Sequence, residues 1–147
     1  MGTQPLLLAS SRTADRKGER LEILLAEDNA VNRMVATRLL ESRGHRVFAV
    51  ANGQEAVDAI MSGKFDIVFM DCQMPVMDGF RAAILIREFE SQRSIRRTPI
   101  VALTANALKG DRDRCIEVGM DDYLSKPVRP ESLNAVLRQW ASWDAAA

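Results

Sequence analysis

The sequence predicts an α/β fold in which five parallel strands alternate with five helices. Five short apolar runs, each followed by a segment with helical spacing of apolar residues, lead to this prediction. Such alternation is typical of a doubly wound parallel sheet with helices on both faces. Right-handed crossovers leave few strand orders. One of them is the flavodoxin-like order 2-1-3-4-5, which would set the first and third strands side by side.

The first strand is predicted over residues 21–26 and stops at the acidic pair Glu27-Asp28. Asn29 follows, and asparagine is a favoured N-cap of helices. The helix that begins there is expected to end at Gly44, because glycine is favoured at the C′ position. Apolar residues recur along it at helical spacing: Val31, Met34, Val35 and Leu39.

The second strand is predicted over residues 45–50, with His45 at its entrance. Gly53 opens the second helix, which ends at Gly63. The apolar residues of one helical face are expected to point inward: Ala56, Val57, Ile60 and Met61.

The third strand is predicted over residues 66–70, an apolar run rich in β-branched and aromatic residues. Gly63 before it, and Pro75 and Gly79 after it, leave too little room for a helix. Asp71 stands where this strand ends, beyond the carboxyl end of the sheet, where α/β proteins bind their ligands. The following helix is expected from Gly79 to about Ser91.

The fourth strand, residues 100–103, ends at Thr104, and the helix after it, about 107–118, has few large apolar residues. We expect that helix to be the least stable of the five. The fifth strand, 122–125, ends at Lys126-Pro127. Pro130 suits the first position of the last helix. The inner stripe of that helix is predicted to be Leu133, Val136, Leu137 and Trp140.

The length of 147 residues fits one domain, and the 20 basic and 20 acidic residues balance. We therefore expect a linker or disordered arm over 1–20, one domain over 21–143 and a short tail over 144–147. The charge balance predicts no binding to nucleic acid, and no apolar run is long enough to contact a membrane by spanning it. Cys72 and Cys115 lack a metal-ligand spacing, which favours reduced thiols and a cytoplasmic segment, whether or not the parent protein is membrane-anchored.

The predicted strand order brings four strand ends to one rim, carrying Glu27-Asp28, Asp71, Thr104 and Lys126. Carboxylates crowded together repel, and their pKa values rise unless a cation intervenes. Carboxylate oxygens with room for water suit Mg²⁺ or Mn²⁺. Together with a lysine and a threonine hydroxyl, such a site suits phosphoryl transfer onto Asp71.

Each of these residues alone also has an ordinary structural explanation. An acid can cap a turn, a threonine can satisfy backbone groups at a strand end, and a lysine can simply be exposed. Their shared position, each at the carboxyl end of a strand, favours the functional interpretation.

Four motifs of this chain resemble those of receiver domains of two-component response regulators: LLAEDN (24–29), FMDCQMPVMDG (69–79), VALTANA (101–107) and GMDDYLSKP (119–127). The resemblance covers about residues 21–140 and is greatest to receivers attached to hybrid sensor histidine kinases. It implies the 2-1-3-4-5 order, for which receivers are a known example.

The resemblance implies a role for each residue at the rim. Asp71 would be the phosphoacceptor. Asp28, Asp71 and the backbone carbonyl of Gln73 would bind the metal ion, and Glu27 would act largely through water. Thr104 and Lys126 would hold the phosphoryl group. Tyr123, with Thr104, would form the conformational switch, although half-buried packing is an alternative explanation for a lone tyrosine. The Lys126–Pro127 bond would be cis.

The implied function is that of a phosphorelay receiver. It would take a phosphoryl group from a histidine kinase and then switch conformation or pass the group to a histidine phosphotransfer domain. The exposed face of the first helix, residues 32–38, is the candidate contact surface. No turnover is expected beyond self-phosphorylation and autodephosphorylation, although the parent chain would be a hybrid histidine kinase.

Three alternatives share parts of this pattern. A flavodoxin-like FMN protein would need a hydroxyl- and glycine-rich loop after the first strand, where this chain has Glu27-Asp28. A phosphohydrolase of the haloacid dehalogenase class would have a second aspartate at the position of Gln73. A receiver-like interaction module without chemistry would not need the complete set of acidic residues, threonine and lysine.

Overall fold

The computed structural model describes residues 20–105 and 109–143, so the predicted arm up to residue 19 and the tail 144–147 lie outside the described residues. Strands and helices alternate along the chain, as predicted. They are β1 (Glu22–Ala26), α2 (Ala30–Glu41), β2 (Arg46–Val50), α3 (Gly53–Ser62), β3 (Ile67–Asp71), α4 (Gly79–Arg93), β4 (Ile100–Thr104), α5 (Lys109–Glu117), β5 (Asp122–Ser125) and α6 (Pro130–Ala141).

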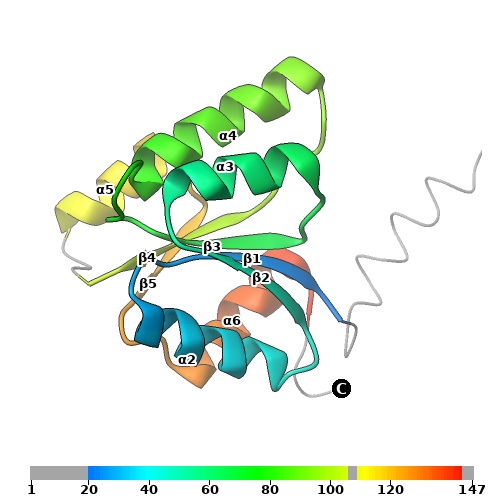
Figure 1. The fold of residues 1–147 in the computed structure, drawn as a ribbon, viewed down its shortest axis with the longest axis vertical. Coiled ribbons are helices and arrows are strands. Elements are labelled where there is room, and N and C mark those ends of the chain that lie inside the picture. Colours follow the sequence, from blue (N-terminus) through cyan, green and yellow to red (C-terminus); the bar gives the residue numbers. More distant parts are fainter. Residues whose placement is uncertain (1–19, 106–108, 144–147) are drawn as a thin grey trace, which may run out of the picture.

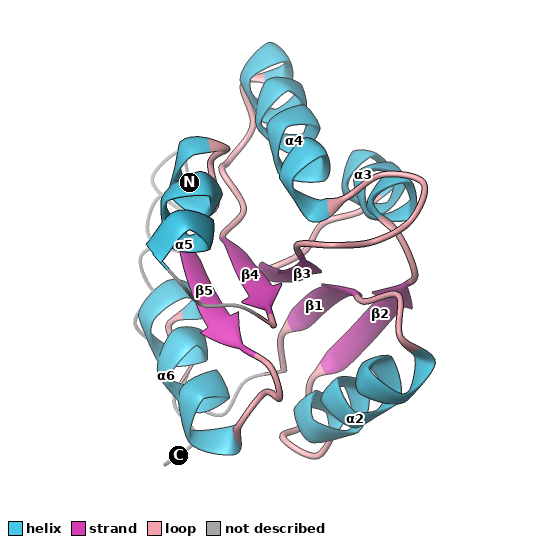
Figure 2. Ribbon diagram, turned by 90° about the vertical axis from the view of Figure 1, so that its left-hand side faces the viewer, coloured by secondary structure: helices cyan, strands magenta, loops and turns pink. Residues whose placement is uncertain are grey.

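The strands form one parallel sheet in the order β2-β1-β3-β4-β5, which confirms the predicted fold class (Figure 2). Ile23 lies opposite both Val47 of β2 and Ile67 of β3. The carboxyl ends of β1, β3, β4 and β5 therefore lie at one rim of the sheet. This arrangement positions the candidate site.

Helices cover both faces of the sheet: α3, α4 and α5 on one side, and α2 and α6 on the other (Figure 1). The core is accordingly divided into two clusters. Alternate residues of each central strand point into one cluster or the other; in β3, for example, Val68 joins the first and Phe69 the second. Every residue of β3 is buried, as expected for a central strand of a parallel sheet.

Of the four apolar residues of α2 that recur at helical spacing, three are exposed. Val31, Met34 and Val35 are exposed by 63%, 45% and 53%. The helix packs instead through Leu40, with Leu39 and the small Ala36 beside it. Because the other apolar residues of the helix also recur at helical spacing, the pattern alone did not decide which face is buried.

The other helices follow the sequence more closely. Asn29 caps α2 by accepting from the amide of Asn32, as predicted, and Pro130 occupies the first turn of α6. In α3 the predicted inner face is buried except for Met61, whose side chain is largely exposed. The described part of α5 buries only Cys115 among its side chains, and its predicted low stability stays a prediction.

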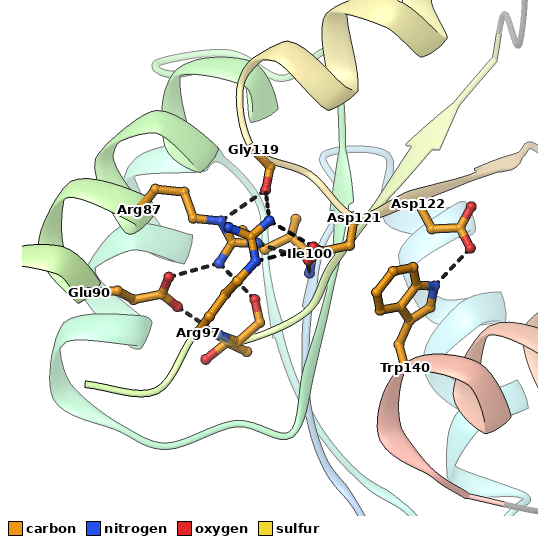
Figure 3. A network of polar contacts seen from close by, with 9 residues as sticks. Arg87, Glu90, Arg97, Ile100, Gly119, Asp121, Asp122 and Trp140 are labelled. Carbon is orange, nitrogen blue, oxygen red and sulfur yellow. Dashed lines mark hydrogen bonds and ion pairs between the residues drawn. The ribbon is translucent and has the colours of Figure 1, made fainter. Parts of the chain in front are cut away.

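The rim opposite the candidate site carries an arginine network formed by Arg87, Glu90, Arg97 and Asp121 (Figure 3). Arg87 donates to Glu90 at 2.8 Å and to Asp121 at 2.9 Å. The carboxylates also accept from the amides of Thr98 and Ile100. The network thus ties α4 to the beginnings of β4 and β5, and every carboxylate in it has a guanidinium partner.

Within the part of the chain that the structure describes, no helix is both long and apolar enough to cross a membrane.

The Lys126–Pro127 peptide bond is cis, as the resemblance implied.

Candidate functional site

The carboxyl ends of four strands bring the predicted site residues together. Glu27 and Asp28 directly follow β1, Asp71 is the last residue of β3, Thr104 is the last residue of β4, and Lys126 directly follows β5. The backbone fixes these ends to one another, since the amide of Lys126 donates to the carbonyl of Thr104 at 2.8 Å.

Asp71 is buried, and both of its carboxylate oxygens have donors. Lys126 Nζ lies 2.8 Å from Oδ2, and the amide of Gln73 donates to Oδ1 at 3.2 Å. The ammonium of Lys126 also lies 3.1 Å from Glu27 Oε1. The lysine therefore bridges two acids, and the carboxylate of Asp71 is held in one orientation.

Burial raises the pKa of Asp71 to about 6, although the hydrogen bond from Lys126 opposes the shift, and the nearby Glu27 raises it further. For Lys126, burial lowers the pKa, but the hydrogen bonds and charges of Asp71 and Glu27 outweigh it, so the pKa lies above the usual value. One lysine thus leaves the negative charge of the site incompletely compensated.

The acidic pair after β1 has one buried and one exposed member. Glu27 is buried, and its Oε2 accepts from the amide of Asn29 at 3.0 Å, at the start of α2. Asp28 is exposed. Arg33, one turn into α2, donates to the backbone carbonyl of Glu27 at 2.8 Å and so fixes the loop, not the carboxylates.

Glu27, Asp28 and Asp71, here called the acidic cluster, each offer one carboxylate oxygen, and these oxygens lie within 4.8 Å of one another. An all-oxygen set with an exposed member and uncompensated charge fits a hard divalent cation such as Mg²⁺. Burial and the neighbouring Glu27 raise the pKa of Asp71, and a cation bound here would favour its charged form.

The loop after β3 lies so close to neighbouring backbone that glycine is needed at two positions. A Cβ atom on Gly79 would lie 2.2 Å from the carbonyl oxygen of Asp71, and one on Gly53 would lie 2.4 Å from that of Met77. Within this loop, Val76 adopts a positive φ of 70° and is exposed. This backbone is held by the surrounding contacts, not by local preference.

The two predicted switch residues contact α5. Thr104 is buried, and its hydroxyl donates to Asp111 Oδ2 at 3.2 Å. Tyr123 is half-buried in β5, and the guanidinium carbon of Arg112 lies 5.0 Å from the centre of its ring. Neither contact was predicted from the sequence, because each depends on how α5 packs against β4 and β5.

The two cysteines, which the sequence predicted to be reduced, are free thiols in the core. Cys72 follows Asp71 directly, and its sulfur lies 3.8 Å from that of Cys115. Their contact joins the end of β3 to α5. Both thiols pack between the sheet and its helices.

The fold and the site together define a class: an open α/β protein of flavodoxin-like order with an acidic cluster and a lysine at the carboxyl rim. Comparison with known families identifies the family within this class. The chain belongs to the response regulator receiver domain family, which matches residues 23–138. It is thus a receiver domain of two-component signalling.

The curated relatives include proteins that contain kinases. The chain is 46% identical to the hybrid signal transduction protein dokA of Dictyostelium discoideum, over 83% of its own length and 7% of that protein. It is 43% identical to the sensor histidine kinase GacS of Pseudomonas protegens, over 80% of its length and 13% of the kinase. The chain therefore spans a small part of these relatives.

Two solved structures are similar over most of the chain. One is the receiver domain of the sensor histidine kinase PA1611 from Pseudomonas aeruginosa, with magnesium coordinated in its active-site cleft (46% identity, TM-score 0.76, 84% of this chain and 98% of that one). The other is the Saccharomyces cerevisiae receiver domain of Ssk1, solved with the histidine phosphotransfer protein Ypd1 (33% identity, TM-score 0.79, 87% and 97%).

Proposed function

We propose that this receiver domain takes a phosphoryl group from a phosphorylated histidine onto Asp71, with Mg²⁺ or Mn²⁺ bound beside it. The observation that supports this most is the state of Asp71. It is a buried strand-end carboxylate whose pKa is raised to about 6 even though Lys126 donates to it at 2.8 Å. A partly desolvated carboxylate held in one orientation is suited to act as a nucleophile.

The metal ion would be held by carboxylate oxygens of Asp28 and Asp71 and by the main-chain carbonyl of Gln73, with Glu27 acting through water. When bound, Mg²⁺ supplies positive charge that stabilises the negative phosphoryl oxygens. The acidic cluster fits this role, and the related PA1611 receiver contains magnesium in its cleft.

In the transfer step, a carboxylate oxygen of Asp71 attacks the phosphorus of the phosphohistidine. The phosphorus–nitrogen bond breaks, the imidazole leaves with its electron pair, and an acyl phosphate remains on Asp71. Lys126 already lies beside the attacking carboxylate, so its ammonium would stay close to the new phosphoryl oxygens.

The phosphoryl group would then accept a hydrogen bond from Thr104 and draw that side chain toward Asp71. Tyr123 would turn into the space that Thr104 leaves. We describe this as a shift of an existing equilibrium between two conformations, because a ligand stabilises a state only through its differential affinity.

The exposed face of α2 is the proposed contact surface for the kinase domain or the histidine phosphotransfer domain. The face comprises residues 32–38 and includes the exposed side chains of Met34 and Val35. It begins four residues after Asp28, so a partner seated there would lie next to the acidic cluster. Exposed apolar side chains beside a polar site favour a small, transient protein contact.

We further infer that the domain acts in the cytoplasm as part of a hybrid histidine kinase and binds neither nucleic acid nor membranes. The zero formal net charge supports the absence of both kinds of binding, since a basic surface is the usual sign of binding to nucleic acid or anionic lipid.

The first experiment tests the phosphoacceptor. The protein is incubated with acetyl phosphate and Mg²⁺, and the labelled residue is identified by mass spectrometry. Labelling should be confined to Asp71, be lost in Asp71→Asn and require the metal. Asp78→Asn is the matched control: it lies in the same loop and caps α4, and asparagine caps as well as aspartate. Equal labelling of Asp71→Asn, or labelling that a chelator does not reduce, would refute the proposal.

The second experiment tests the contact surface. Labelled protein is mixed with a panel of purified histidine phosphotransfer domains, and loss of label from Asp71 is followed. Val35→Asp should slow the transfer to a competent partner, whereas Met61→Asp, a similarly exposed residue on α3, should not. Transfer that slows only in the α3 variant would place the partner elsewhere. Retardation of a DNA fragment at physiological salt would contradict the expected absence of nucleic-acid binding.

A further inference from the structure

The first described turns of α5 contact both proposed switch residues at once. Thr104 and Tyr123 lie on the neighbouring strands β4 and β5, where Ala102 is opposite Tyr123. Asp111 accepts the hydroxyl hydrogen of Thr104 at 3.2 Å, and the next residue, Arg112, lies over the ring of Tyr123 at 5.0 Å. Two consecutive residues of one helix thus each contact one member of the switch.

We propose that Asp111 and Arg112 are positioning residues that hold the switch of this receiver in its resting conformation. This inference rests on the proposed function, because it takes Thr104 and Tyr123 to be the groups that respond to phosphorylation. It adds two residues of α5 that set how strongly the resting conformation is favoured.

Asp111 competes directly with the phosphoryl group. A threonine hydroxyl has a single hydrogen, so it cannot donate to Asp111 and to a phosphoryl oxygen on Asp71 at the same time. The carboxylate is a strong, charged acceptor. Thr104 therefore has to give up this bond before it contacts the phosphoryl group, and the apparent affinity for that group is reduced accordingly.

Arg112 acts on the other switch residue. A guanidinium over a tyrosine ring is attracted by the negative face of the ring. Turning Tyr123 inward would break this contact. Because Arg112 is exposed, its contribution should be smaller than that of the Thr104–Asp111 bond.

The shared helix couples the two contacts. A displacement of α5 that separates Asp111 from Thr104 would also move Arg112 relative to Tyr123, so both contacts are expected to break together. The phosphoryl signal would then reach α5 and β5 as one concerted change.

The test measures the affinity for beryllofluoride, a phosphoryl mimic, at saturating Mg²⁺ by titration calorimetry. Asp111→Ala should bind it about tenfold more tightly than the unsubstituted domain, called the parent below, since the competing acceptor is gone. Arg112→Met should bind it about twofold to fivefold more tightly. Asp113→Ala, an exposed acid of the same helix, and Arg93→Met, which contacts Phe89, are matched controls and should bind like the parent.

Two further variants separate the hydrogen bond from simple charge repulsion. Asp111→Asn keeps an acceptor for Thr104 while removing the charge, and a neutral acceptor competes less strongly than a carboxylate, so its affinity for the mimic should lie between that of the parent and that of Asp111→Ala. In a Thr104→Val background, Asp111→Ala should have no effect. Tightening in Asp111→Asn equal to that in Asp111→Ala, or an undiminished effect in the Thr104→Val background, would overturn the role of Asp111.

Amide hydrogen exchange gives a readout of the resting conformation itself. Without the mimic, residues 110–117 should exchange faster in Asp111→Ala than in the parent protein, as they should in the parent once beryllofluoride is added. If the parent protein does not bind the mimic, the proposed function fails. If the parent binds but Asp111→Ala and Arg112→Met bind equally well, only the present inference fails.

Discussion

The two rims of the sheet both hold clustered acidic residues, but their charges are balanced differently. In the arginine network at the amino ends of β4 and β5, each carboxylate has a guanidinium partner and a backbone amide donor. In the acidic cluster at the carboxyl ends, the ammonium of Lys126 contacts two of the three carboxylates, those of Glu27 and Asp71.

The difference indicates which rim is structural and which is reactive. Satisfied buried charges hold elements together, and removing one partner leaves the other uncompensated. Unsatisfied charges instead store repulsion, which a cation or a substrate can relieve. The raised pKa of Asp71 is the sign of its burial and of that repulsion.

The largest expected effect comes from Arg87→Met, which breaks the arginine network at its centre. Glu90 and Asp121 would both lose a buried partner, so the free energy of unfolding should fall by about 3–5 kcal/mol. Methionine keeps the apolar stem of the side chain. Urea denaturation measures the change, and a loss below about 1 kcal/mol would show that this rim is not the structural one.

Asp71→Asn should change the free energy of unfolding in the opposite direction, by stabilising the metal-free protein. The folded-state pKa of about 6 lies above the ordinary value of 3.8, so the folded protein binds more protons between these values. The stability that the protonated acid contributes is present below about pH 4 and is lost as the pH rises through 6. Removing the charge should therefore stabilise the metal-free protein at pH 7 by about 1–3 kcal/mol.

Urea denaturation from pH 4 to pH 7 without metal checks this expectation. The parent protein should lose stability over that range relative to Asp71→Asn. Parallel profiles for the two proteins would mean that Asp71 is not strained by its surroundings.

Asp28→Asn tests the acidic cluster as a metal site. Removing a charged ligand should weaken Mg²⁺ binding by at least about tenfold, while thermal unfolding without metal stays unchanged or shifts upward. Titration calorimetry measures the affinity, with Asp58→Asn, an exposed acid of α3, as the control. An unchanged affinity would remove Asp28 from the ligand set.

The smallest effect is expected for Arg97→Met. Its side chain is 56% exposed, although it lies 2.7 Å from Asp121. Exposed ion pairs contribute little, and Arg87 would still pair with Asp121, so the loss should stay below about 1 kcal/mol. A loss equal to that of Arg87→Met would show that exposure does not separate the two arginines.

The sequence by itself determined the order of strands and helices and which residues stand at strand ends. These features depend on local patterns: buried apolar runs, helical spacing, and residues such as Asn29 and Pro130 that favour particular helix positions. Once parallel strands are identified, chain direction alone brings Asp28, Asp71 and Lys126 to one rim.

Only the tertiary structure decided which surfaces are buried and which side chains meet. In α2, Val31, Met34 and Val35 recur at helical spacing but are exposed, and the helix buries Leu40 against the sheet. The contacts of α5 with the switch residues, such as Asp111 with Thr104, likewise depend on how the helix sits against β4 and β5. Burial and long-range pairing are set by neighbouring elements, and a periodic pattern within one segment carries no information about where those neighbours lie.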